Sequence, residues 1–378
     1  MDDTVEFYSG IPGHVWETQP DFPPSIHDLL RRRETYIPDD GLKSAVNVAL
    51  LLGLPLLVTG PPGSGKTRLA HALAAELKLG EPLEVIVKSD ATSRDLLYLF
   101  DELGRFQDAQ ATGSPSSRSN EAATRPLRAY LRFQPLGRAI LRAGGPDAPI
   151  ELLDGHAFRG RHRNEVPKTF GDLAPDVFYE FPNPAVQLVL IDELDKAPRD
   201  LPNDLLRELE DMAFEIKELG IRIRVPRSEG TIPRRPILVI TSNAERSLPE
   251  PFLRRVAFYD IPDPTRQRLI DMLKLRFTGI GSPDTIMNSV DFFQAVIKDL
   301  PAGERKPGTA EFLAWFSFLN RKGLGSGSAD KPTDLPTALR ASLVILAKTQ
   351  DSLTALSEQV EAKIDTAEAQ RDAAKKVR

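Results

Sequence analysis

Short apolar runs that end in polar residues recur along the first two-thirds of the chain. Four of them read PLLVTG at 55–60, LEVIVKS at 83–89, VQLVLIDE at 186–193 and PILVITSN at 236–243. Runs of this length and composition are typical of buried strands in a parallel sheet. Amphipathic helical patterns separate them, beginning with DDGLKSAVNVALLLG at 39–53. Strands that alternate with helices predict an α/β fold with a parallel sheet.

The pattern changes after Pro264, because β-like runs stop and helical spacing dominates to the end of the chain. We therefore expect a small all-α domain after the α/β core. The predicted organisation is an extended N-terminal arm at 1–24, a core at 25–262 with a long insert at about 95–184 and a hairpin at about 213–233, a helical lid at 263–356 and a charged helical tail at 357–378.

Composition narrows the class of protein. The 378 residues are 41% hydrophobic, carry a net charge of −5 and include no cysteine. A chain without cysteine has no disulfides, thiolate nucleophiles or cysteine-ligated zinc. The acidic N-terminus does not resemble a secretory signal, and no apolar run is long enough to cross a membrane. We expect a soluble cytoplasmic protein with no membrane partner.

A phosphate-binding loop follows the first predicted strand. The segment GPPGSGKT matches the pattern G-x-x-x-x-G-K-[ST] in full, with a strand before it and an amphipathic helix after it. Its glycines let backbone N–H groups surround phosphate oxygens at a helix N-terminus. The expected nucleotide-binding residues are Gly60, Pro61, Pro62, Gly63, Ser64, Gly65, Lys66, Thr67 and the next residue, Arg68. Among them, Lys66 is expected to reach the β and γ phosphates and Thr67 to ligate Mg²⁺.

Two later strands end in residues suited to phosphoryl transfer. Asp192 and Glu193 follow the run LVLI, and Asn243 follows ILVITS. Asp192 is expected to hold Mg²⁺ with Thr67, while Glu193 orients and polarises the attacking water. The Asn243 amide can hydrogen-bond both the γ-phosphate and that water. ATP and Mg²⁺ are therefore the expected substrate and metal.

The order of these motifs resembles that of AAA+ ATPases. The segments DATSRDLLYLFD, PLGRAIL, IDELDKAPRDLPNDLLRELEDMAF and SLPEPFLRRVAFYDIP are similar to those of the MoxR-like branch, and the resemblance covers roughly 25–350. It implies a P-loop NTPase core followed by a helical lid, and a hexameric ring of identical subunits with each ATP lying between two of them. It further implies work on a client protein, together with a von Willebrand A domain partner.

The resemblance also gives roles to residues outside the phosphate loop. An arginine before the last core strand reaches the neighbouring subunit's nucleotide, which makes Arg255 the first candidate and Arg254 the second. A planar, always-charged guanidinium suits the charge of a transferring phosphoryl group. The lid arginine of many members is replaced here by Ala310, with Arg305 or Lys306 as substitutes.

The residues that select the base of the nucleotide are expected near Tyr36 and Ile37. The phosphate loop itself does not distinguish ATP from GTP.

Residues 105–168 hold eleven Arg or Lys and six Asp or Glu, a net charge of +5. Such an insert suits an acidic client or nucleic acid, and equally a solvated surface. His156 and His162, which also fall in this insert, lack metal-ligand spacing and are treated as structural.

Apolar residues alternate around Gly220 and predict a β-hairpin; they are Phe214, Ile216, Ile221, Ile223 and Val225. In MoxR-like proteins such a hairpin and the insert lie over the pore.

Two alternatives to a protein-remodelling motor remain. One is a nucleic-acid-directed NTPase subunit of a defence or restriction system, and the other is a self-contained P-loop kinase or switch.

Overall fold

A computed structural model describes residues 25–26, 36–112, 126–153, 167–179, 183–226, 234–277, 283–298, 300, 304–322 and 335–376. The chain divides into two compact units. The first comprises Met1–Ile37, Pro61–Gly65 and Pro262–Arg378, and the second comprises Pro38–Gly60 and Lys66–Ile261. His156 and His162 lie outside the described residues.

A five-stranded parallel sheet forms the centre of the second unit. Its strand order is β10-β1-β9-β6-β2. The strands are β1 (Leu56–Thr59), β2 (Leu83–Ile86), β6 (Leu188–Asp192), β9 (Ile237–Thr241) and β10 (Ala257–Asp260). Strand β1 is buried along its whole length and β6 and β9 along most of theirs. This burial explains their continuous apolar runs, since both faces of a parallel sheet are covered.

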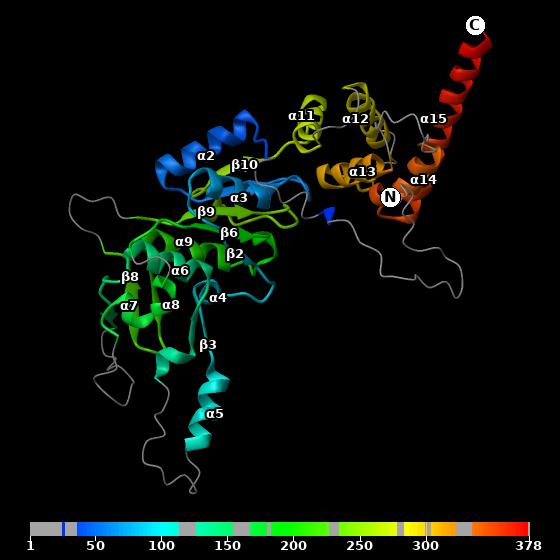
Figure 1. Cartoon of the computed structure of the whole chain (residues 1–378). Helices are drawn as coiled ribbons and strands as arrows, with labels where there is room; N and C mark the ends of the chain where they lie inside the picture. The colour runs from blue at the N-terminus through cyan, green and yellow to red at the C-terminus, as the bar shows by residue number, and fades with distance from the viewer. Residues whose placement is uncertain are drawn as a thin grey trace. The chain divides into compact units, whose positions relative to one another are not determined.

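Helices cover both faces of the sheet. In Figure 1, α2 (Asp40–Leu52) and α3 (Lys66–Glu76) lie on one side of the strands, and α6 (Pro135–Gly144) and α9 (Leu201–Asp211) lie on the other. Helix α2 begins where the Asp39 side chain accepts a hydrogen bond from the Leu42 amide. It ends at Gly53, whose φ of 65° is a conformation that glycine adopts without strain.

The segment between β2 and β6 also folds into short elements, several of which pack on the same core. They are α4 (Ser93–Leu97), β3 (Tyr98–Phe100), α5 (Glu102–Thr112), the 3-10 turn η2 (Leu127–Tyr130), β4 (Leu131–Phe133), β5 (Glu151–Leu152), α7 (Phe170–Leu173) and α8 (Pro175–Phe178). Strands β3 and β4 pair antiparallel.

The predicted alternation around Gly220 corresponds to the antiparallel strands β7 (Ala213–Ile216) and β8 (Ile221–Arg224). Phe214 faces Ile223 and Ile216 faces Ile221 across the pair. Gly220 has a φ of 68°, as a tight turn requires. Strand β5 extends this pair to a three-stranded sheet.

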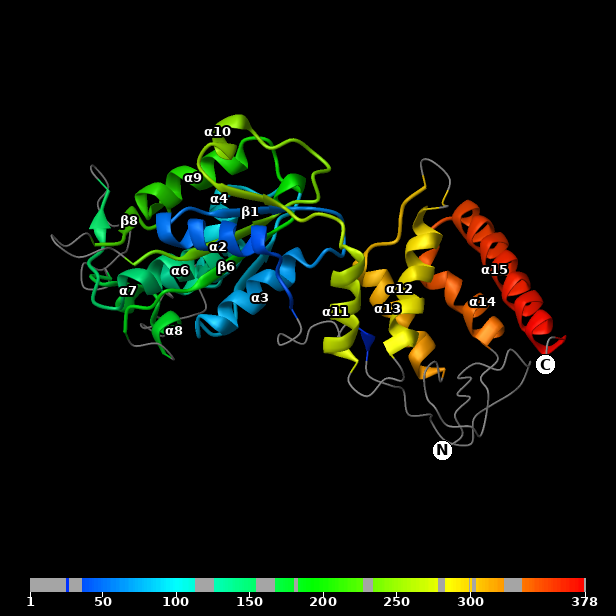
Figure 2. The ribbon, with the colours of Figure 1, turned by 90° about the horizontal axis from the view of Figure 1, so that it is seen from above.

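The helices of the first unit pack around their own apolar core, and Figure 2 shows them gathered together. They are α11 (Arg266–Arg276), α12 (Pro283–Lys298), α13 (Thr309–Arg321), α14 (Leu335–Leu346) and α15 (Gln350–Lys376). Buried Trp315 donates a hydrogen bond to Ser342 and stacks on Phe292. Helix α15 runs without a break through position 357, the predicted start of the charged tail.

The expected fold class, a P-loop NTPase core with a parallel sheet followed by a small all-α domain, is confirmed. No helix within the described ranges is long and apolar enough to span a membrane.

Candidate nucleotide site

The strands that carry the predicted catalytic residues end at one edge of the sheet. Because β1, β6 and β9 are adjacent and parallel, their carboxyl ends lie side by side. This edge brings together Gly60 after β1, Asp192 at the end of β6, and Asn243 after β9. Ligands of open α/β sheets bind outside such carboxyl ends.

The phosphate loop has a backbone that suits glycine. Gly63 and Gly65 have φ values of 78° and 96°, which side-chain-bearing residues rarely adopt. A Cβ on Gly63 would lie 3.0 Å from the Cβ of Ala310, and one on Gly65 would lie 3.2 Å from Cε2 of Tyr36. The Ser64 amide donates to the Pro61 carbonyl at 3.2 Å, closing the turn.

Lys66 is nearly buried at the start of α3, with 7% of its surface exposed. Its ammonium donates a hydrogen bond to the Gly60 carbonyl at 2.7 Å. Burial lowers the pKa of Lys66, and nearby carboxylates, first Asp192, oppose that effect. A cation held in this position can meet phosphate oxygens with little further loss of hydration.

Thr67 and Asp192 lie next to each other at this edge of the sheet. The Thr67 hydroxyl lies 3.3 Å and 3.2 Å from the two carboxylate oxygens of Asp192. Thr241, the last residue of β9, also donates a hydrogen bond to Asp192. A hydroxyl and a carboxylate side by side are the oxygen donors that Mg²⁺ prefers, so these residues fit the expected metal.

Glu193 directly follows β6 and has a left-handed backbone, with φ of 60°. Its amide donates to the Thr241 hydroxyl at 3.1 Å, which fixes the turn. Its two carboxylate oxygens have different neighbours. Oε2 accepts a hydrogen bond from Lys196 at 2.7 Å, and Oε1 lies 3.5 Å from Nδ2 of Asn243.

Asp195 fixes the loop that carries Asn243. The Asp195 side chain is 3% exposed, and its Oδ2 accepts hydrogen bonds from the amides of Asn243 at 3.2 Å and Glu245 at 3.0 Å. Charge-assisted bonds of this kind hold a backbone segment more firmly than neutral ones. The position of the Asn243 amide group therefore depends on a carboxylate from the neighbouring strand end.

The two candidate arginines lie at the opposite edge of the sheet. Arg254 and Arg255 directly precede β10, at its amino end, and both are exposed. Arg254 pairs with Glu250 in α10 (Glu250–Leu253), while Arg255 Nε lies 3.3 Å from Oε1 of Glu210. The structure thus does not bring either arginine to the Lys66 site of its own chain.

The other residues that were expected to contact the nucleotide lie in different units. Arg68 is half-buried on α3 in the second unit. Tyr36 and Ile37 belong to the first unit, where Tyr36 lies against Gly65 and the Ile37 carbonyl accepts a hydrogen bond from Arg268 at 3.0 Å.

A pocket of about 600 Å³ within the first unit is lined by loop residues Pro61, Pro62 and Ser64 and by residues of the helical domain. Tyr36 and Ile37 are not among its lining residues. Arg305 and Lys306 line it, and Arg305 lies 3.8 Å from Glu311. Ala310 contributes only a methyl group beside Gly63. The cationic residues that line this pocket are Lys298, Arg305 and Lys306.

Part of the basic insert is in the described part of the chain, and there some arginines have structural partners. Arg142 is 6% exposed and donates to Gln187 at 2.7 Å and to the Val177 carbonyl. Arg128 donates to the Asp172 carbonyl, and Arg138 pairs with Asp176. Among these three arginines, Arg142 is buried within the fold and Arg138 has a carboxylate partner.

Three residues of the site were not predicted from the sequence: Thr241, Asp195 and Lys196. Lys196 and Asp195 stand in the same segment, DELDK, as the predicted acids. The spacing of Glu193 and Lys196, three positions apart, is a signal for a side-chain pair on a helical turn. Thr241 carries no local signal, because its role arises only from the pairing of β6 with β9.

Comparison with known proteins finds a family model that is similar to part of the chain. Residues 55–116 match the model of the AAA domain (dynein-related subfamily). No curated protein matches the chain. Similar solved structures include a variant of Thermotoga maritima RuvB, at 15% identity and a TM-score of 0.41, covering 86% of this chain and 75% of that one. A second Thermotoga maritima RuvB structure, described as a Holliday junction branch migration motor, has 15% identity, the same coverage and a TM-score of 0.39.

The matched segment contains the whole phosphate loop and helix α3. Around it the chain forms a five-stranded parallel sheet with Asp192, Glu193 and Asn243 at its carboxyl edge. Residues 55–116 are thus similar to an AAA domain, and they lie within a core that has the P-loop NTPase fold.

Proposed function

We propose that this protein is an ATPase that works as a ring of identical subunits and uses ATP to remodel or activate a partner protein, in the manner of MoxR-like AAA+ proteins. The observation that carries the proposal is the set of side chains at the carboxyl edge of the sheet. There Lys66, Thr67, Asp192, Glu193 and Asn243 offer a cation, two metal-binding oxygens, a carboxylate and an amide.

Each residue has one task in this proposal. Lys66 neutralises the phosphate charge, and the backbone amides of Gly63 and Gly65 cradle phosphate oxygens. Thr67 and Asp192 hold Mg²⁺, which when bound neutralises charge on the phosphates. Glu193 orients the attacking water and accepts its proton, and Asn243 keeps that water and the phosphate in line.

Arg255 completes the site in a neighbouring subunit. It lies at the amino edge of the sheet, so it can serve only another copy of the chain if it contacts nucleotide. An arginine supplied in trans accelerates phosphoryl transfer by about 10³- to 10⁵-fold. In the isolated subunit its Nε lies 3.3 Å from Oε1 of Glu210.

The first unit contains a pocket of about 600 Å³ beside Pro61, Pro62 and Ser64, a volume typical of small-ligand sites. Arg305 and Lys306 at its margin take the part of the lid cation that Ala310 cannot provide. The client, and a von Willebrand A domain partner, follow from the sequence resemblance alone.

The proposal is tested with Glu193→Gln, which keeps the size of the side chain and removes its basicity. We expect this variant to bind ATP as the wild type does while phosphate release falls by about 10²- to 10⁴-fold. Glu245→Gln, an exposed change near the same edge, is the matched control and should hydrolyse normally. Turnover of Glu193→Gln within about twofold of the wild type would remove Glu193 from the mechanism.

A further inference from the structure

The side-chain hydroxyl of Thr241 joins two residues of the candidate site. It donates a hydrogen bond to Oδ1 of Asp192, and it accepts one from the amide of Glu193 at 3.1 Å. A hydroxyl has one hydrogen and two lone pairs, so it can make both contacts at once. Thr241 is 1% exposed, and bulk water therefore does not compete for these contacts. The residue expected to hold Mg²⁺ and the residue expected to orient water share one buried partner.

The contact with Thr241 makes the two carboxylate oxygens of Asp192 unequal. Oδ1 accepts the hydrogen bond from Thr241, while the Thr67 hydroxyl lies 3.3 Å from Oδ1 and 3.2 Å from Oδ2. With Oδ1 held by Thr241, Oδ2 remains for Thr67 and for a metal held beside it. Hydrogen bonds from outer residues orient metal-binding carboxylates in this way, and they tune the affinity for the metal.

The contact with Glu193 supports an unfavourable backbone conformation. Glu193 has φ of 60°, in the left-handed region that residues with side chains rarely adopt. Such a conformation persists only where the surrounding structure holds it. The Thr241 hydroxyl is the acceptor for the Glu193 amide, so its removal leaves a partly buried N–H group without that acceptor. The direction of the Glu193 side chain therefore depends on Thr241.

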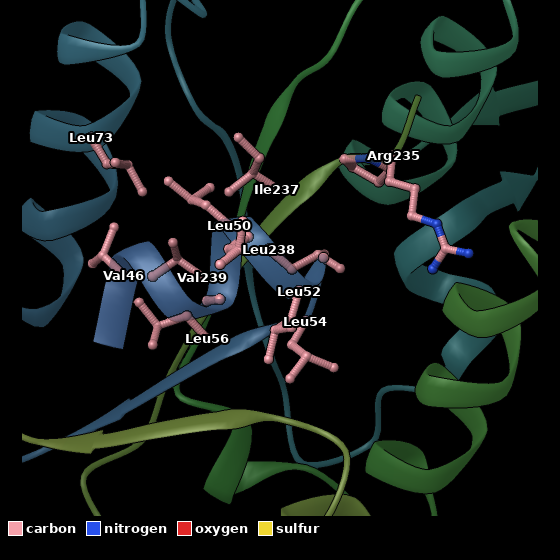
Figure 3. Close-up of a pocket in the computed structure, with 14 residues that line it drawn as sticks. Val46, Leu50, Leu52, Leu54, Leu56, Leu73, Arg235, Ile237, Leu238 and Val239 are labelled. Carbon is pink, nitrogen blue, oxygen red and sulfur yellow. The ribbon is translucent and has the colours of Figure 1, made fainter. Parts of the chain in front are cut away.

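Strand β9 gives Thr241 a rigid support. The strand pairs with β1 on one side and with β6 on the other, and four of its five residues are buried. Figure 3 shows Ile237, Leu238 and Val239 at the other end of the strand, beside leucines of α2 that line an apolar pocket of about 320 Å³. Side chains carried on packed strands are placed more precisely than side chains carried on loops.

We infer that Thr241 is a positioning residue that couples the Mg²⁺ site to the water-orienting glutamate. The inference rests on the proposed function, because it gives Thr241 a part in the same site. In this role Thr241 acts only through Asp192 and Glu193, whose orientations it fixes. A residue of the same shape without a hydroxyl would leave the Asp192 carboxylate free to turn, and it would release the backbone of Glu193. Loss of one hydroxyl should thus impair both metal binding and turnover.

The variant Thr241→Val tests the metal-binding half, because it keeps the β-branched shape and removes the hydroxyl. Binding of a fluorescent ATP analogue to the full chain is titrated with Mg²⁺, and it is measured separately in EDTA. The Mg²⁺ concentration that gives half of the metal-dependent gain in affinity should rise by about 10- to 100-fold. Affinity in EDTA should equal that of the wild type, since the phosphate loop is intact. Thr241→Ser, which restores the hydroxyl, should restore the Mg²⁺ requirement of the wild type.

Thr59 offers a matched control. It is the last residue of the neighbouring strand β1, it is buried, and its hydroxyl also donates a hydrogen bond to an aspartate, Asp260. Thr59→Val should keep the Mg²⁺ requirement of the wild type. An unchanged requirement in Thr241→Val, or an equal rise in Thr59→Val, would overturn the inference. Thr241→Ala is measured in parallel, so that the result does not depend on the folding of one variant.

Steady-state hydrolysis at saturating Mg²⁺ tests the coupling to Glu193. The kcat of Thr241→Val should stay about tenfold or more below that of the wild type, since a loosened glutamate no longer places the water, and Thr241→Ser should regain most of it. Full recovery of kcat at high Mg²⁺ would limit Thr241 to the metal site and overturn the coupling. If the wild type hydrolyses ATP and Thr241→Val matches it throughout, only this inference fails. If the wild type binds no nucleotide, the proposed function fails and this inference fails with it.

Discussion

Lys196 and Glu193 form an ion pair across the turn that follows β6, with Nζ 2.7 Å from Oε2. The hydrogen bond from Lys196 to Glu193 raises the pKa of the lysine, so it stays charged throughout the neutral range. The lysine occupies one carboxylate oxygen of Glu193, and the Asn243 amide lies near the other. Glu193 is therefore held in one orientation before any substrate arrives.

This pair predicts a positioning effect. In Lys196→Met the Glu193 carboxylate loses its fixed orientation, and kcat should fall by roughly tenfold, since a misplacement of about 1 Å can cost up to about 100-fold. The KM for ATP should stay unchanged because the proposed role of Lys196 is to hold Glu193 and not to bind nucleotide. Steady-state hydrolysis measures both quantities. Lys196→Arg should restore most of kcat; an increase of KM with unchanged kcat would instead assign Lys196 to substrate binding.

Lys66 should determine nucleotide affinity. A hydrogen bond to a charged group is worth about 1.5–3 kcal/mol, so Lys66→Ala should weaken ATP binding by about 10- to 150-fold. Titration with a fluorescent ATP analogue reports the change. Lys43→Ala, an exposed lysine of α2, serves as the control and should bind as the wild type does. Equal affinity of the two variants would contradict the phosphate-loop assignment.

The shared site predicts rescue between two inactive proteins. Lys66→Ala and Arg255→Ala should each lose hydrolysis, by up to about 10³- to 10⁵-fold for the arginine. A mixture should recover activity, because some interfaces then join an intact Lys66 to an intact Arg255. Lys66→Ala mixed with Glu193→Gln is the control, and it should show no rescue because every nucleotide site then lacks one of the two residues. Absence of recovery in the first mixture, with exchange of subunits demonstrated, would contradict a finger in trans.

Glu208 on α9 predicts a pH dependence of stability. Burial raises the pKa of this glutamate from 4.5 to about 7, against a hydrogen bond from Ser93 that acts in the opposite direction. The fold thus favours the neutral carboxyl, and the free energy of unfolding should decrease as pH rises from about 4.5 to about 7 and stay level above. The total loss is at most about 3 kcal/mol, since one pKa unit corresponds to about 1.4 kcal/mol.

Glu208→Gln should remove that decline and stabilise the protein at pH 8, with little effect at pH 4. Denaturant unfolding at the two pH values measures the difference. Asp211→Asn, which changes an exposed carboxylate on the same helix, should leave the pH profile as in the wild type. A profile of Glu208→Gln that parallels the wild type would show that Glu208 is ionised in the fold.

The sequence was sufficient to predict the sheet and the phosphate loop, because both depend on local pattern. A short apolar run such as Leu56–Thr59, bounded by Pro55 and Gly60, is consistent with a buried strand, and the glycines after it complete the phosphate-loop pattern. Asp192 and Asn243 were found for the same reason, since each stands at the end of such a run.

The site residues that the sequence did not predict are placed by tertiary contacts. Thr241 reaches Asp192 only because β9 pairs with β6, and Asp195 fixes Asn243 from a different strand end. The secondary structure of the insert was difficult to predict, because its strands β3 and β4 are three residues long and pair across a wide sequence gap. Short strands of this kind carry too little periodicity to be identified.

Glu193 occupies a backbone conformation with φ of 60°, in which a glutamate is strained and a glycine is not. Such strain costs about 1 kcal/mol or more at a residue that must keep its side chain. Glu193→Gly would relax this backbone, but it would also remove the ion pair with Lys196 and the carboxylate that the proposed mechanism requires. The backbone at this position therefore favours glycine, while the proposed chemistry requires glutamate.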